Sequence, residues 1–173
     1  MTLIQDHEVL GTYLKDVAHY DEKDIVGTVT LREFVANFLN YHPAWIAFLY
    51  RVRGQFVRLL GLQQISLSDK PALHAQTIPF EAGEMLGFFA VDVAKEGEFF
   101  VARGTDKHLT AYLIILCEPL AGGMNRFYVG TAVQYHNWAG PVYFNVIRPF
   151  HHIVVQMMMR AGVKDAQLVK ATI

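Results

Sequence analysis

From residue 83 to residue 135 the chain places apolar side chains at every second position, which is the period of half-buried β-strands. Glu96-Gly97 can form a two-residue hairpin turn, and Asp106-Lys107 can form a second one. The pattern predicts four antiparallel strands that share one apolar face. The strand pairs expected from the two turns are Val91–Ala102, Val93–Phe100, Gly104–Leu109 and Ala102–Ala111.

The last of these strands follows a loop at 118–125 and contributes one alternating set of side chains to the common face. That set is Phe127, Val129, Thr131, Val133 and Tyr135. The other strands add three small residues, Ala102, Gly104 and Ala111, which favour an open space above the sheet.

The opposite face of the same strands is also apolar. It carries Phe88, Phe99, Val101, Tyr112, Ile114, Leu116 and Tyr128. A monomer rarely leaves so large an apolar surface in water. Either the segment 62–82 covers this face, or two chains pack sheet to sheet, and we expect a homodimer.

The first half of the chain predicts a short strand and two helices. Residues 10–21 are expected to form the strand. The sequence TLRE at 30–33 is a capping-box pattern that begins a helix ending before Pro43. Pro43 opens a second helix, which ends at Gly61 and has apolar residues at helical spacing.

A long C-terminal helix is predicted from Pro141 onward, with a kink or break at Pro149, which removes one backbone hydrogen bond. At 3.6 residues per turn, one side of the helix carries Phe144, Ile147, His151, Val154 and Met158, and another carries Asn145, Arg148, His152, Gln156 and Arg160.

Two adjacent histidines lie on different sides of this helix, because successive residues project about 100° apart. His151 and His152 are therefore poorly placed to hold one metal ion together. His152 belongs with Arg148 and is expected in solvent. His151 points inward, either as a core histidine satisfied by a carbonyl or hydroxyl group or as a polar group in a pocket.

Composition narrows the class of protein. The chain has 173 residues, of which 53% are hydrophobic and 18% charged, with a formal net charge of −1. This length predicts a single domain over residues 1–173, and the lack of a basic stripe argues against nucleic-acid binding. One cysteine, no secretory signal and no apolar run long enough to span a bilayer favour a cytoplasmic protein. The eight histidines are scattered, so we expect no metal and no cofactor.

Two stretches resemble a known group of proteins. They are ARGTDKHLTAYLII (102–115) and TAVQYHNWAGPVYFNVIRPFHHIVV (131–155). Together with the order of elements they are similar to an uncharacterised bacterial family within the START, polyketide-cyclase and pollen-allergen-like superfamily, over most of residues 30–160. The matching residues are Asp106, His108, Leu109, His136, Asn137, Gly140, Tyr143, Pro149, Phe150 and His151. Pro141 departs from the pattern, where a basic residue is expected.

The resemblance implies an α+β helix-grip fold, in which a curved antiparallel sheet wraps around a long C-terminal helix and two short helices follow the first strand. It also implies an apolar cavity between sheet and helix. It brings no established reaction.

Three functions stay open on this basis. The first is binding of a small hydrophobic or amphipathic molecule in the cavity. The second is a cyclase, dehydratase or isomerase that uses His151 or Tyr135 as proton donor. The third is a non-catalytic interaction protein with a filled core. The candidate ligand-binding residues are Thr131, Tyr135, His136, Tyr143, Phe144, His151, Met158, Ala102 and Gly104.

Overall fold

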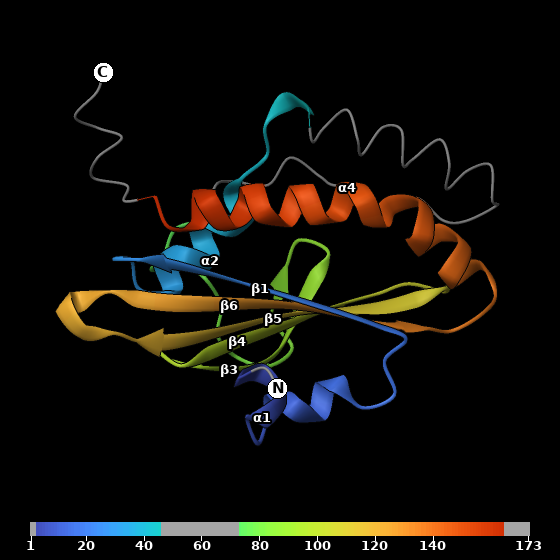
Figure 1. Cartoon of the computed structure of the whole chain (residues 1–173), viewed down its shortest axis with the longest axis horizontal. Helices are drawn as coiled ribbons and strands as arrows, with labels where there is room; N and C mark the ends of the chain where they lie inside the picture. The colour runs from blue at the N-terminus through green and yellow to red at the C-terminus, as the bar shows by residue number, and fades with distance from the viewer. Residues whose placement is uncertain (1–2, 46–72, 165–173) are drawn as a thin grey trace.

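A computed structural model describes residues 3–45 and 73–164. Six antiparallel strands form one curved sheet in the order β1-β6-β5-β4-β3-β2, and a long helix, α4, crosses one of its faces (Figure 1). The predicted α+β architecture is confirmed. The elements are α1 (Leu3–Asp6), η1 (Leu10–Leu14), β1 (His19–Gly27), α2 (Leu31–Asn40), β2 (Met85–Leu86), β3 (Phe89–Lys95), β4 (Phe99–Thr105), β5 (Leu109–Pro119), η2 (Ala121–Gly123), β6 (Asn125–Tyr135) and α4 (Ala139–Gly162).

The β3–β4 hairpin follows the predicted register only at its open end. Val91 lies opposite Ala102 as expected. A bulge between Val91 and Val93 then shifts the pairing by one residue, so Val93 lies opposite Val101 and the expected Val93–Phe100 pair is wrong. A bulge adds one residue to one strand and cannot be read from an alternating pattern.

The β4–β5 register differs from the prediction by two residues, because the turn is longer than expected. Gly104 lies opposite Ala111 and Ala102 opposite Leu113. Asp106 builds this turn, since its Oδ1 accepts hydrogen bonds from the amides of His108 at 2.7 Å and Leu109 at 3.0 Å. A shift of two residues leaves every side chain on its predicted face.

The main core lies between the helices α2 and α4 and the face of the sheet that they cover, which we call the inner face. Phe34 of α2 stacks on Phe127 of β6, with ring centroids 4.2 Å apart. The predicted capping box of α2 is present: Thr30 Oγ1 accepts from the Glu33 amide, and the Glu33 carboxylate accepts from the Thr30 amide at 2.7 Å. The second predicted helix, 43–61, lies almost wholly outside the described residues.

The outer face of the sheet is covered by the N-terminal residues. The strand expected at 10–21 lies later in the chain, because residues 10–14 form the short helix η1 and only residues 19–21 of that range belong to β1. Ile4 and Leu10, both 0% exposed, pack against Phe99, Val101 and Ile114. The apolar outer face that suggested a homodimer is therefore already covered within one chain. Phe88, expected on that face, lies against Gly104 instead.

Helix α4 continues through Pro149, with its first turns at an angle to the rest in Figure 1. Its buried side includes Phe144, as expected, but then Val155 and Met159 rather than Val154 and Met158. The reason is geometric: eleven residues make about three turns, so Val155 returns to the side of Phe144, and Val154 lies about 100° away. None of the helices in the described ranges is long and apolar enough to cross a bilayer.

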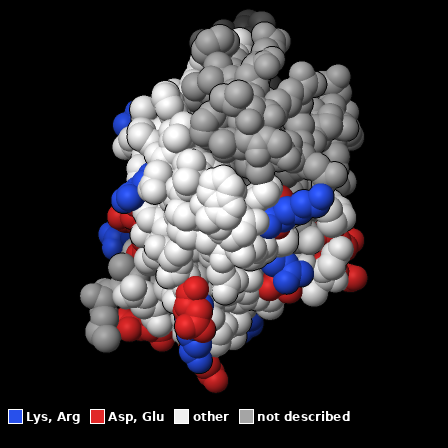
Figure 2. Space-filling view, turned by 90° about the vertical axis from the view of Figure 1, so that its right-hand side faces the viewer, with Lys and Arg blue, Asp and Glu red and all other residues white. Residues whose placement is uncertain are grey.

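Large apolar side chains lie on the outer side of α4. They are Trp138, Val142, Val146, Phe150 and Ile153, and Trp138 is the most exposed at 77%. The end of the molecule where α4 begins is seen in Figure 2, which shows a broad area without charged side chains. Phe150 and Ile153 thus face outward while His151 and His152 between them are partly buried. This is the reverse of the usual arrangement for a helix that covers a sheet.

Two glycines allow α4 to approach its neighbours closely. A Cβ atom on Gly140 would lie 2.7 Å from the carbonyl oxygen of His108, and one on Gly162 would lie 2.6 Å from Cε2 of Phe34. Both distances are too short for a real contact. The glycines therefore set how close each end of α4 lies to the rest of the fold.

We predict that Gly162→Ala lowers the free energy of unfolding by about 1–3 kcal/mol, because the new methyl group overlaps the buried ring of Phe34. Urea denaturation measures the loss. In the double variant Phe34→Leu/Gly162→Ala the overlap is relieved, so the two losses should be less than additive. Strict additivity would contradict the contact.

We also predict that Leu10→Asp detaches the N-terminal cover, because it puts a carboxylate into a fully buried apolar site. The expected loss of stability is about 3 kcal/mol or more, with increased binding of a hydrophobic dye to the outer face. Val9→Asp is the matched control, since Val9 is 38% exposed, and it should cost less than about 0.5 kcal/mol. Equal losses of stability in the two variants would show that the N-terminal cover contributes nothing to the free energy of unfolding.

Candidate functional site

The inner side of β1 carries polar residues where the other strands carry apolar ones. His19 lies opposite Val133 and Asp21 opposite Thr131, so both face the same side as the inner residues of β6, and Lys23 follows at the same period. The helix α4 supplies His151 and His152 above them. We call His19, Asp21, Lys23, His151 and His152 the histidine cluster.

The charged part of the cluster is a network of three side chains. Lys23 forms an ion pair with Asp21. Nδ1 of His152 lies 3.1 Å from Oδ2 of Asp21 and 3.2 Å from Nζ of Lys23. The prediction that His152 is simply solvated is wrong, because its side chain is 32% exposed and joins β1. Burial acts to raise the pKa of Asp21, but the hydrogen bond and charge of Lys23, together with His152, outweigh it and lower the pKa.

His151 occupies the more buried part of the cluster. Burial, with a smaller effect of the His152 charge, lowers the pKa of His151 to about 4, so its ring is neutral at pH 7. Its Nε2 atom is buried and has no hydrogen-bond partner among the described residues. Two alternatives were left open for His151. The first, a core histidine whose Nε2 atom bonds to a carbonyl or hydroxyl group, is not seen among the described residues.

His19 has the same two properties. Burial, followed by the charge of Arg148, lowers the pKa of His19 below its ordinary value. Its Nε2 atom is also buried without a partner in the described residues. Two unpaired imidazole nitrogens in one cluster are unusual, since buried polar atoms in native proteins nearly always have a partner.

Phe144 connects these histidines to an apolar neighbourhood. Its ring centroid lies 4.8 Å from that of His19, 6.3 Å from that of His151 and 6.2 Å from that of Tyr135. Tyr143 and Phe144, both 4% exposed, form a small apolar core with Leu109 and Val133. Burial raises the pKa of Tyr135. The structure thus brings together His151, Tyr135, Tyr143 and Phe144, with Thr131 on the strand beside Asp21.

The remaining predicted site residues lie elsewhere. His136 is exposed, with Nε2 3.0 Å from Oγ1 of Thr110. Ala102 belongs to the main core, and Met158 packs against that core. A Cβ atom on Gly104 would lie 2.3 Å from Cε1 of Phe88, so the space expected above this glycine is filled by a side chain.

Sequence reasoning missed three members of the cluster, His19, Asp21 and Lys23. The signal was their own period of two, followed by Ile25, in the run HYDEKDIVG. Because the set is mostly polar, it lacks the apolar alternation that identifies a half-buried strand.

The turn residues singled out by the resemblance have structural partners. His108 lies beside Asn137, with Nδ1 3.3 Å from Asn137 Oδ1. Asn137 Oδ1 also accepts from the amide of Ala139, the first residue of α4, at 3.0 Å. In residues 3–45 and 73–164 no three His, Cys, Asp or Glu side chains are arranged to hold a metal ion.

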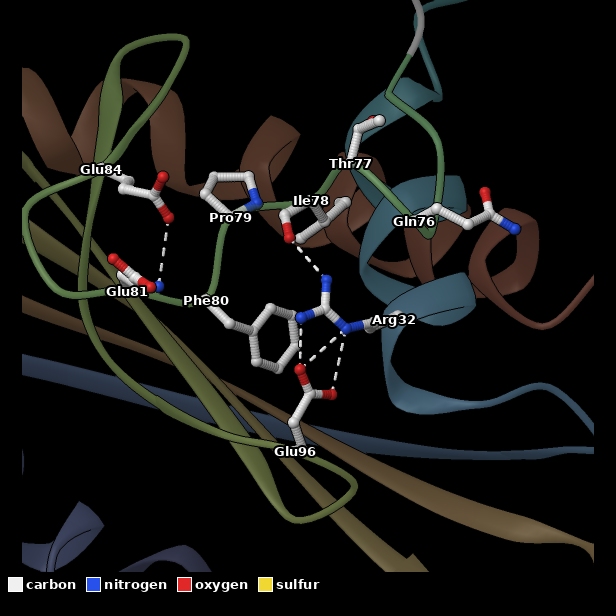
Figure 3. A pocket seen from close by; sticks show the side chains of 9 residues that line it. All are labelled: Arg32, Gln76, Thr77, Ile78, Pro79, Phe80, Glu81, Glu84 and Glu96. Atoms are coloured by element: carbon white, nitrogen blue, oxygen red, sulfur yellow. Dashed lines mark hydrogen bonds and ion pairs between the residues drawn. The ribbon is translucent and has the colours of Figure 1, made fainter.

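A pocket of about 460 Å³ lies on another part of the surface, beside the first turn of α2 (Figure 3). Arg32 stands at its centre, over the ring of Phe80 at 4.1 Å, paired with Glu96 and donating to the carbonyl of Ile78 at 2.6 Å. These partners use the guanidinium donors. Arg32 therefore connects α2 with the segment that contains Ile78 and Phe80 and with the turn that contains Glu96. The residues that line the pocket are Arg32, Gln76, Thr77, Ile78, Pro79, Phe80, Glu81, Glu84 and Glu96.

Comparisons with known proteins give a family and no activity. No curated protein matches the chain. The crystal structure of Ara h 8.0201 is similar at 10% identity and a TM-score of 0.40, over 85% of this chain and 99% of that one. A likeness at this level supports no functional conclusion. The family model described as "Protein of unknown function (DUF2867)" matches residues 10–158. This match covers most of the chain and agrees with the resemblance to an uncharacterised family, and the protein therefore belongs to the DUF2867 family.

Proposed function

We propose that the protein binds a small amphipathic molecule between α4 and the inner face of the sheet, with the polar end of the molecule at the histidine cluster. The observation that carries this proposal is the pair of buried Nε2 atoms, on His19 and His151, that lack partners in the described residues. An unpaired buried polar atom costs about 1–3 kcal/mol. A ligand that offers a hydrogen-bonding group removes that cost, which makes binding favourable.

The apolar end of the molecule is assigned to the neighbourhood of Phe144. The reason is position, because Phe144 is the apolar side chain whose ring lies closest to His19 in the cluster, with centroids 4.8 Å apart. The side chains packed with Phe144 are Leu109 and Val133, with Ile147 and Ala111 partly buried beside them. An apolar lining with a few polar groups is typical of small-molecule sites.

The two side chains considered as proton donors are poorly suited to that role. A ring with a pKa of about 4 is unprotonated at pH 7, so His151 has no proton to give as an imidazolium. The raised pKa of Tyr135 makes its hydroxyl a weaker acid. Binding without a reaction is therefore the function that these groups support best.

Two further expectations from the sequence stay proposals: a homodimer and a cytoplasmic location. With the outer face of the sheet covered, a dimer must use another surface. Light scattering after size exclusion measures the mass of the full chain in solution.

We predict that the gently purified protein carries one small molecule per chain in native mass spectrometry. His151→Phe should remove it, because the ring replaces the polar atom and narrows the site. His74→Phe is the control, since His74 is exposed and outside the cluster. The unaltered chain could instead show the mass of the protein alone, and its melting temperature could stay unchanged with medium-chain acids, medium-chain alcohols and aromatic polyketides. These two results together would support the filled-core interaction protein.

The pKa of His151 predicts a pH dependence of stability. The folded value of about 4 lies below the ordinary value of 6.5, so between these values the unfolded chain binds a proton that the folded chain does not. This contribution to stability is complete above pH 6.5 and is lost as the pH falls towards 4. Between pH 7.5 and 5 the expected loss is about 2 kcal/mol.

Urea denaturation at both pH values measures this loss. His151→Gln should remove most of it, leaving the smaller effect of His19, which has the same sign. His74→Gln should keep the slope of the unaltered chain. An unchanged slope in His151→Gln would show that His151 is not the titrating group.

A further inference from the structure

We infer that the polar end of the ligand is a carboxylate or another group with a single negative charge, held by Arg148 and by the Nε2 atoms of His19 and His151. This inference rests on the proposed function and names the chemical class that the same site accepts.

Arg148 lies beside the cluster on α4. It is one turn after Phe144 and one turn before His151 and His152, and residues three or four apart on a helix are neighbours on its surface. The side chain of Arg148 is exposed. Its charge acts to lower the pKa of both His19 and Tyr135, so the guanidinium lies within electrostatic reach of these two side chains. Among the described residues, Arg148 has no hydrogen-bond or ion-pair partner.

The charges around Arg148 do not balance. Asp21 is the carboxylate of the cluster, and it is already paired with Lys23. From Ala139 to Gly162, α4 itself contains no Asp or Glu. Burial lowers the pKa of both His19 and His151, which disfavours their charged forms. The guanidinium of Arg148 is exposed, and no acidic side chain among the described residues pairs with it.

A carboxylate matches this arrangement in charge and in hydrogen bonding. A guanidinium can donate two parallel hydrogen bonds to it, and charge-assisted bonds of this kind are about twice as strong as neutral ones. A neutral imidazole carries one N–H, which can donate to a carboxylate oxygen through Nε2. An alcohol would leave the charge of Arg148 unpaired, and an amine would be repelled.

The test compares decanoic acid, decan-1-ol and decylamine, which share one apolar chain, by calorimetric titration of the full chain at pH 7.5. We expect the acid to bind about tenfold more tightly than the alcohol, and the amine to bind more weakly than both. Arg148→Gln should lower the affinity for the acid about tenfold and leave that for the alcohol within about twofold. Arg160→Gln, a change of an exposed arginine three turns along the same helix, is the matched control and should change neither.

The outcomes separate the two proposals. If the alcohol and the acid bind equally, or if Arg148→Gln weakens both equally, the anionic class is wrong and the amphipathic site stands. If none of the three binds to the unaltered chain, the proposed function fails and this inference fails with it.

Discussion

The close approach of α4 at its two ends is the constraint on which the rest of the site depends. Gly140 lies against the carbonyl of His108 near the start of the helix, and Gly162 lies against the ring of Phe34 at its end. Phe34 is in turn stacked on Phe127 of the sheet. Because both ends are fixed, the middle of α4 must lie over whatever the edge strand β1 presents there. What β1 presents is a polar set, and this explains why His151 and His152 face inward while Phe150 and Ile153 face solvent.

The polar side chains of β1 also suit its place at one edge of the sheet. An edge strand has free backbone groups that can pair with another chain, and inward-pointing charges are one way in which proteins discourage such pairing. Asp21 and Lys23 point inward in this manner and compensate each other. The same two residues lie beside His152, whereas the lowered pKa values of His19 and His151 come mainly from burial. Protection of the edge and the proposed binding site are thus compatible uses of one set of residues.

The sequence predicted the faces of the strands better than their partners. A slip of two residues between β4 and β5 leaves Ala102 and Leu113 on the inner face as predicted, whereas Val93 moves to the outer cluster after the bulge. The bulge after Val91 and the partner of His152 depend on contacts between distant segments, which periodicity does not contain. The N-terminal cover was missed for a different reason. Ile4 and Leu10 are isolated apolar residues in a short irregular segment, and only the complementary surface of Phe99 and Ile114 shows their role.

The pairing of β1 with β6 has a consequence for how the chain folds. His19 pairs with Val133 and Gly27 with Asn125, so β1 can join the sheet only after β6 is available. During synthesis the β3–β5 meander can form early from neighbouring segments, whereas β1 must wait for nearly the whole chain. Closing such a long loop is entropically costly and slows folding. Until it closes, one edge of β6 has unpaired backbone groups, and an unpaired strand edge can pair with another chain.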